Sequence, residues 1–524
     1  MKLVKLFAAT AAVSALGWGA ASAQVDADLT DNNLRIEFDH CPLSMCASFQ
    51  PETEAELVAF LQDFAADRQG VVDAAAMQAN AASSNTGTNG RGLKQGQQNN
   101  APQVVYLRFG SASPFFNVFV NGVPFAGGIF PDYIYSQSDR DFIQQRLEDD
   151  YAAYNYEFTQ TEPGSGDYTT LRIGDNDANP IDLAGGILFG RADNIDFGND
   201  SRNDGAFVDA SFWQLLAELD ANFGTQNLAG FLGLGAPLDA AGIETFRRIA
   251  VVNQSANTAS HELGHIQGLR HHDSFGAPGS GLPPARSPGE FIPLLETDQA
   301  ALETLSHIMA SGASAGLALN SPPFVDRFFS ERSAVKLAIN ARIRAIEEDF
   351  IAVTNGKLDL NKVVAANPLL AGANSGGKLD VRAGLVNGTI AQLDEADHYE
   401  IDGRAGDVFN AEIISSSDSN IADFVLARLS LQLRQADGSF VEVAANQRTF
   451  EGLEPLIFDY TLPETGTYRI EVTGPDLVPL ADGTLVSLGA LGLNSFRTGD
   501  YNLLAYTVEG APGNGPSSVP GPSN

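Results

Sequence analysis

Cysteine is nearly absent from this chain of 524 residues, which contains only two. Basic residues are also scarce, because 31 lysines and arginines stand against 65 aspartates and glutamates, for a formal net charge of −34. Binding to nucleic acid needs a basic surface, so this charge argues against nucleic acid as a partner. The excess of acid suits a protein that must stay dissolved outside the cell, and it leaves spare carboxylates for calcium.

Long apolar runs are missing as well, apart from one near the N-terminus. Lys2 and Lys5 precede an apolar stretch from Leu6 to about Ala20, and Ala21-Ser22-Ala23 follows it as a cleavage signal. The stretch is too short for a comfortable membrane span. We expect residues 1–23 to be a signal peptide that is removed. The mature chain is then secreted to the extracellular space or the periplasm, without stable insertion into a membrane.

Histidine is scarce too, and its distribution is uneven. Four of the seven histidines lie in His-Glu-Leu-Gly-His-Ile-Gln-Gly-Leu-Arg-His-His-Asp, residues 261–273. Two histidines four residues apart share one face of a helix, so His261 and His265 can bind one ion. Gly268 permits a turn that a residue with a Cβ would resist, and this turn brings His271 back as a third ligand.

Glu262 follows the first of these histidines directly. It is close to the ion without being aimed at it, which is where a general base takes a proton from a metal-activated water. Three neutral histidines with a fourth position left for water are typical of catalytic rather than structural zinc. We expect one catalytic Zn²⁺ on His261, His265 and His271, with Glu262 as the base. His272 is expected at the rim, because a ligand there would close the position that water needs.

These residues resemble the H-E-x-x-H-x-x-G-x-x-H motif of the metzincin superfamily of zinc endopeptidases, in which a methionine turn follows. Of the four methionines only Met309 lies downstream of the histidines, in Ser-His-Ile-Met-Ala-Ser-Gly, residues 306–312. The resemblance implies that Met309 forms an apolar floor under the histidines. A methionine that fills a gap in the core is the plainer interpretation, and the two hardly conflict. Astacin- and serralysin-like members carry a tyrosine that reaches the zinc two residues later, where this chain has Ser311.

The segment before the catalytic region has two interpretations. Residues 24–80 are acidic and partly helical, and residues 81–102 are rich in Gly, Asn and Gln, which is typical of a flexible linker. They form either a propeptide with a cleavable linker or a small accessory domain. Cys41 and Cys46 favour a short-loop disulfide. The alternative is a latency switch in which one thiolate caps the zinc, although the surrounding residues do not match the matrixin propeptide motif.

From residue 103 the pattern becomes α/β. The resemblance implies a metzincin-like catalytic domain, a twisted mixed sheet with an active-site helix, over residues 103–350. Residues 185–192 resemble the metzincin edge strand, which binds substrate by strand addition, or else form an ordinary core strand. Strands are expected at 104–109, 156–161 and 168–173, a hairpin around Asn121-Gly122, and a helix capped by Ser138.

Acidic residues crowd the stretch from Asp175 to Asp209. Oxygen donors on loops invite a structural Ca²⁺, but a solvated acidic loop accounts for them equally well. The spacing fails the EF-hand pattern, because position six counted from Asp175 is Pro180 and position twelve is Gly186.

The C-terminal third has a different pattern. Residues 326–350 are expected to form a long helix that closes the catalytic domain, and residues 351–378 to connect it to short alternating strands at 379–508, a β-sandwich. Asp397–Ile401 and Leu462–Ile470 resemble the pre-peptidase C-terminal domain appended to secreted bacterial proteases. Because the connector carries no site residue, each half is expected to fold alone.

The expected function is that of a secreted zinc endopeptidase that hydrolyses peptide bonds in proteins or peptides. One alternative is a non-catalytic secreted binding or adhesion protein on a zinc-stabilised metzincin fold, and another is a zinc hydrolase acting on non-peptide amides. The sequence indicates neither cleavage specificity nor oligomeric state. The expected segments are a signal peptide (1–23), an acidic segment (24–80), a linker (81–102), the protease domain (103–350), a connector (351–378), the sandwich (379–508) and a disordered tail (509–524).

Overall fold

A computed structural model of the chain describes most of the sequence from residue 102 onward, together with a short piece before it. Residues 1–23, expected to be a signal peptide, both cysteines and most of residues 24–101 lie outside the described residues. Within the described part, no helix combines the length and apolarity needed to cross a membrane. The described residues are 53–59, 61–62, 102–110, 115–120, 123–174, 181–182, 189–193, 195, 202–224, 237–274, 307–309, 327–341, 343, 345–348, 351, 356–366, 378–415, 425–447, 454–480 and 483–509.

The first half of the molecule is built on a five-stranded sheet with the order β4-β1-β5-β8-β7. All neighbouring strands run parallel except β7, which is antiparallel to β8 and is the outermost strand on that side. Alternating burial along β1 shows that one face of the sheet is packed against a core, as its Val and aromatic residues favour. The strands are β1 (Gln103–Phe109), β4 (Tyr156–Thr159), β5 (Thr169–Ile173), β7 (Gly190–Ala192) and β8 (Gly205–Val208).

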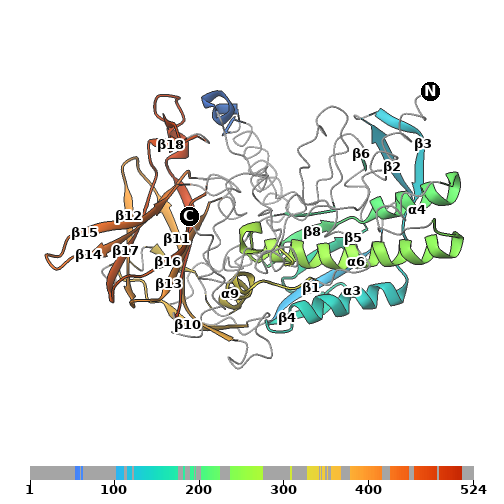
Figure 1. The fold of residues 1–524 in the computed structure, drawn as a ribbon, viewed down its shortest axis with the longest axis horizontal. Coiled ribbons are helices and arrows are strands. Elements are labelled where there is room, and N and C mark those ends of the chain that lie inside the picture. The colour runs from blue at the N-terminus through green and yellow to red at the C-terminus, as the bar shows by residue number, and fades with distance from the viewer. Residues whose placement is uncertain are drawn as a thin grey trace.

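Helices α3 (Gln137–Asp150) and α6 (Ala240–Ile266) run side by side across this sheet, and α4 (Ser211–Phe223) also packs on α6 (Figure 1). The cap of α3 is Ser136 rather than Ser138, because Ser136 and Asp139 form a reciprocal capping box. Asp239 caps the N-terminus of α6, where its side chain accepts from the amide of Gly242. The predicted hairpin around Asn121-Gly122 is confirmed by β2 (Phe115–Val120) and β3 (Val123–Pro131), which pair antiparallel, while β6 (Ile181–Asp182) adds a third strand.

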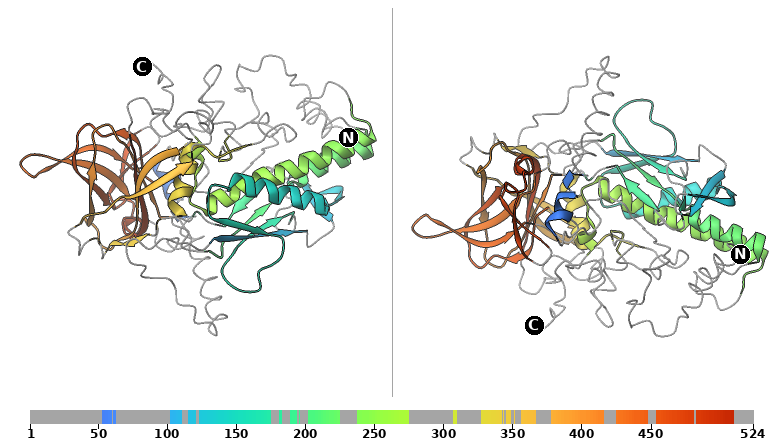
Figure 2. Two further views of the ribbon diagram at one scale, coloured as in Figure 1. Left: turned by 90° about the horizontal axis from the view of Figure 1, so that it is seen from below. Right: turned by 90° about the horizontal axis from the view of Figure 1, so that it is seen from above.

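The helix expected at 326–350 is shorter than predicted. Helix α9 spans only Glu331–Asn340, and the short strand β9 (Ile346–Glu347) pairs with a strand of the C-terminal sheet. One face of α9 buries Val335 and Ile339 against the C-terminal sheet. This helix therefore packs between the two halves of the chain (Figure 2) instead of ending the first half.

The C-terminal region consists of two facing sheets, in agreement with the predicted sandwich, and their strands pair antiparallel except that β9 runs parallel to β11. One has six strands, with the order β10-β11-β20-β13-β16 and β9 beside β11, and the other has the order β12-β17-β14-β15. The expected connector at 351–378 is partly wrong, because residues 361–366 form a strand of the six-stranded sheet. Apolar side chains of both sheets form the core between them, including Ile401, Phe409 and Leu431. The strands are β10 (Asn361–Ala366), β11 (Lys378–Ile390), β12 (Ala396–Gly403), β13 (Val408–Ile414), β14 (Arg428–Arg434), β15 (Phe440–Asn446), β16 (Leu456–Thr461), β17 (Gly466–Thr473) and β20 (Gly499–Val508), with the small pair β18 (Leu477–Pro479) and β19 (Leu485–Ser487) beside them.

A short helical piece of the predicted propeptide or accessory segment also lies on the C-terminal region. Residues 54–59 and 61–62 are helical, and they bury Leu57 and Leu61 almost completely. The two leucines pack with Leu426, Val486 and other apolar residues near the β18–β19 pair. Burying a leucine contributes roughly 1.5–3 kcal/mol, so these contacts hold the segment to the second half of the chain.

Candidate metal centre

The C-terminal end of α6 carries the first two histidines of the motif. Beyond this end, Gly268 adopts a φ of +81°, the left-handed conformation expected of it. The amide of Gly268 donates to the carbonyl of His265, and the amide of Leu269 donates to that of Gly264. These two bonds form a Schellman motif, which stops the helix and reverses the chain. The chain then enters η4, the 3₁₀ helix His271–Ser274.

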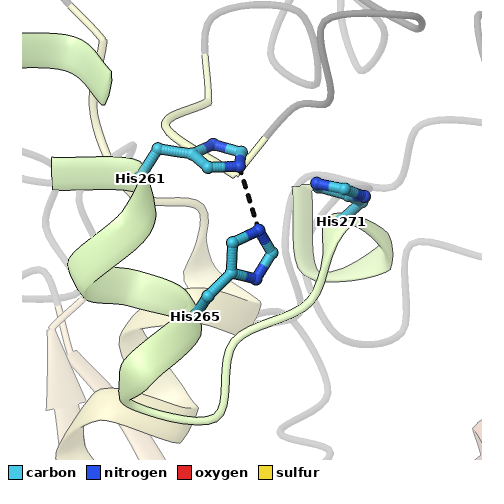
Figure 3. Close-up of side chains that lie close together, drawn as sticks. All are labelled: His261, His265 and His271. Carbon is cyan, nitrogen blue, oxygen red and sulfur yellow. Dashed lines mark hydrogen bonds between the residues drawn. The ribbon is translucent and has the colours of Figure 1, made fainter. Parts of the chain in front are cut away.

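The structure brings His261, His265 and His271 together (Figure 3). One ring nitrogen from each lies within 4.8 Å of the others, and all three side chains are buried. The Nε2 atoms of His261 and His265 are 3.0 Å apart. The predicted cluster is thus confirmed as a group that could bind a metal ion.

Backbone carbonyls orient two of the three rings. The Nδ1 of His261 lies 2.6 Å from the carbonyl oxygen of Ile308, and the Nδ1 of His265 lies 2.8 Å from that of Leu269. A carbonyl oxygen only accepts, so each Nδ1 carries the proton and donates it. Each neutral ring then has its lone pair on Nε2. Two Nε2 lone pairs that face each other at 3.0 Å fit a shared cation, so these residues suit a metal ion.

Met309 lies directly beneath the helix that carries the histidines. It is completely buried, and a Cβ added to Gly264, between the two helical histidines, would lie 2.5 Å from its Sδ. Ile308, its neighbour, provides the carbonyl that orients His261. Met309 therefore packs against α6 between the positions of His261 and His265, and its neighbour Ile308 orients one of the candidate ligands. The assignment of this segment as a methionine turn stays a prediction. Ser311 lies outside the described residues.

Glu262 points toward the edge strand β7. Its side chain is fully buried, and it lies so close to Gly190 that a Cβ there would be 2.8 Å from its Cγ and 2.5 Å from Cγ2 of Thr258. Only a residue without a side chain leaves this space. The candidate base therefore lies between α6, to which it belongs, and β7, the outermost of the described strands on that side of the sheet.

The expectation that His272 lies at the rim is wrong. His272 is buried, and its Nε2 is 3.3 Å from Oε1 of Glu412, a residue of strand β13 in the C-terminal sandwich. Burial raises the pKa of Glu412, but the neighbouring Lys336 and His272 charges outweigh it and lower the pKa to about 2. Glu412 is therefore ionised at neutral pH, and the second half of the chain lies directly against the histidine turn.

Other predicted features are described only in part. Residues 189–192 include the edge strand β7, whereas residues 185–188 lie outside the described residues. Half of the eight acidic residues considered for calcium lie outside as well, namely Asp175, Asp177, Asp196 and Asp200. Among the described ones, Asp193 pairs with Arg172 at 3.2 Å. The sequence reasoning missed Gly190 and Glu412. No pattern near either residue links it to the histidines, since each reaches them only through tertiary packing.

No protein-family model and no curated protein matches this chain. Solved structures similar to part of it include a periplasmic inhibitor of g-type lysozyme from Aeromonas hydrophila, with 16% identity over 24% of this chain and 86% of that one and a TM-score of 0.15. A second is the pre-peptidase C-terminal domain of a collagenase from Bacillus anthracis, with 12% identity over 23% of this chain and 86% of that one and a TM-score of 0.16. TM-scores this low assign no function to the chain.

Proposed function

We propose that this protein is a secreted zinc-dependent endopeptidase. The observation that carries the proposal is the convergence of His261, His265 and His271 next to the buried Glu262. Backbone carbonyls hold the Nδ1 atoms of His261 and His265, which leaves their Nε2 atoms for a metal ion. Three neutral imidazoles with no thiolate suit a zinc ion that keeps a position open for water. The motif resembles that of the metzincins, and the signal-like N-terminus supports secretion.

In the proposed reaction the three histidines hold the zinc, Glu262 transfers the proton and strand β7 binds the substrate. Bound zinc would supply a Lewis acid that polarises the scissile carbonyl and makes the attacking water more acidic. Glu262 accepts a proton from that water and later delivers it to the leaving amine. Strand β7 has an outer edge with which an extended peptide can pair. Because Gly190 of this strand lies against Glu262, a peptide on that edge is next to the base.

The rival interpretation is a binding protein on a zinc-stabilised fold. A structural zinc needs no carboxylate beside its ligands, whereas a catalytic zinc needs a general base close to its water. The location of Glu262 against a sheet edge favours an enzyme. The edge also favours a peptide over a small non-peptide amide, because only an extended chain uses backbone pairing along a strand.

The direct test is proteolysis by the secreted full-length protein. We expect it to degrade casein, to lose this activity with a chelator, and to recover it when about one equivalent of Zn²⁺ is returned. The readout is the release of labelled peptide, together with metal analysis and the mature N-terminus by mass spectrometry. A protein that binds zinc but leaves casein and a peptide library uncut would instead support the binding-protein alternative.

The contact between Gly190 and Glu262 makes a second prediction. In Gly190→Ala the new methyl group must displace Glu262 or Thr258, so we expect kcat to fall by about tenfold or more through misplacement of the base. Zinc content should remain that of the wild type. As a control, the same change in a Glu262→Gln background should cost no further activity. A Gly190→Ala enzyme with unchanged kcat would show that Glu262 does not depend on this space.

A further inference from the structure

The third histidine differs from the other two in how it is held. His261 and His265 are fixed relative to each other by the geometry of α6. His271 lies instead in η4, a single 3₁₀ turn of four residues that is separated from α6 by a reversal of the chain. A 3₁₀ turn of this length has few hydrogen bonds of its own, so they do not fix its position relative to α6. The placement of His271 over the other two rings therefore depends on what fastens its neighbours.

Those neighbours, Arg270, His272 and Asp273, are all buried and all face charged groups. The amide of Arg270 donates to Oδ2 of Asp273 over 2.8 Å, which closes the turn. Lys336 of α9 donates to the same carboxylate over 2.7 Å. The hydroxyl of Ser330, the cap of α9, donates to the carbonyl of Asp273. The turn is thereby bound to the helix that packs on the C-terminal sandwich.

Two carboxylates of the sandwich complete these contacts. Glu412 lies 2.6 Å from Nζ of Lys336, 3.3 Å from Nε2 of His272 and 3.5 Å from Nε of Arg270. Glu454, just before β16, pairs with the guanidinium of Arg270 and accepts from the amide of Ser415 over 2.6 Å. A cavity of about 10 Å³ beside Glu412 and Lys336 leaves room for no more than about one water to screen these charges.

We propose that Glu412 and Glu454 are positioning residues for the metal centre, through which the C-terminal sandwich sets the location of His271. The proposal rests on the metal centre of the proposed function, but not on the substrate being a peptide. Arg270 and His272, on either side of His271, pair with these two carboxylates. Removing the carboxylates would leave buried charges without partners, which is destabilising, so the turn would have to shift. On this proposal the second half of the chain completes the metal centre of the first, in contrast to the expectation that each half works alone.

The experiment measures metal binding by the full-length protein. Glu412→Gln and Glu454→Gln keep the shape of each side chain and remove its charge. We expect Zn²⁺ affinity, measured against a chromophoric chelator, to fall by about tenfold or more in each, as for other residues that orient ligands. The visible spectrum of the Co²⁺-substituted protein should change as well. The matched control is Glu442→Gln on β15, which breaks only the exposed pair with Arg428 and should leave both readouts unchanged.

A second variant separates positioning from folding. Lys336→Met combined with Glu412→Gln removes a positive and a negative charge together, so the net charge of the cluster is kept. We expect this double variant to fold, as judged by circular dichroism, and still to bind Zn²⁺ about tenfold or more weakly. Folded variants with wild-type affinity and Co²⁺ spectrum would overturn the proposal alone. A wild-type protein that binds no metal would overturn the proposed metal centre and this inference together.

Discussion

Glu262→Gln is expected to lower kcat by at least about 10²-fold while the zinc stays bound, because the amide keeps the size of the carboxylate but cannot accept a proton. The side chain is fully buried and lies against Gly190, so an isosteric change leaves the packing intact. The measurements are turnover of a labelled peptide and the metal content of the purified protein.

The matched control is Glu244→Gln on the same helix. The side chain of Glu244 is 63% exposed and forms an ion pair with Arg247 at the surface, so we expect wild-type turnover. If Glu262→Gln were as active as the wild type while Glu262 stayed in place, Glu262 would not be the base. If Glu262→Gln lost its zinc, the experiment would reveal a role in the metal centre rather than in proton transfer.

His265→Ala is expected to remove the zinc and with it all measurable proteolysis. His265 supplies one of the three converging nitrogens, and its Nδ1 is tied to Leu269 in the turn that leads to His271. Its loss removes one expected ligand and also the hydrogen bond to Leu269 that holds the turn leading to His271. Metal analysis should fall from about one zinc per chain to near zero.

His398→Ala provides the control for this change. His398 is a half-exposed residue of strand β12 in the C-terminal sandwich, where it pairs with Glu471. It does not belong to the group of three histidines. We expect it to retain zinc and activity. Retention of the full zinc content by a folded His265→Ala protein would contradict the assignment of ligands. Circular dichroism of both variants shows whether the fold is kept.

The three histidines that could bind a metal ion were recognisable in the sequence because the geometry that groups them is local. Two histidines one helical turn apart must share a face, and a glycine three residues later can take the positive φ that reverses the chain. Several strands of the sandwich and the β2–β3 hairpin were also predicted, because alternation and turn residues act over short distances. Strand β10 was not, and its residues were expected to be part of a connector. The end of α9 was also misjudged, since Ile346 pairs with a strand some forty residues away.

What the sequence by itself determined is therefore the group of three histidines that could bind a metal ion, the candidate base and the kinds of elements that carry them. What only the tertiary structure decided is how the third histidine, His271, is held. His272 appeared to belong to an open rim, yet it is buried against Glu412, which lies 140 residues further along the chain. Nothing within the pattern of residues 261–273 encodes that partner. Contacts between distant segments depend on how whole sheets and helices pack, and this packing joins the C-terminal sandwich to the histidine turn.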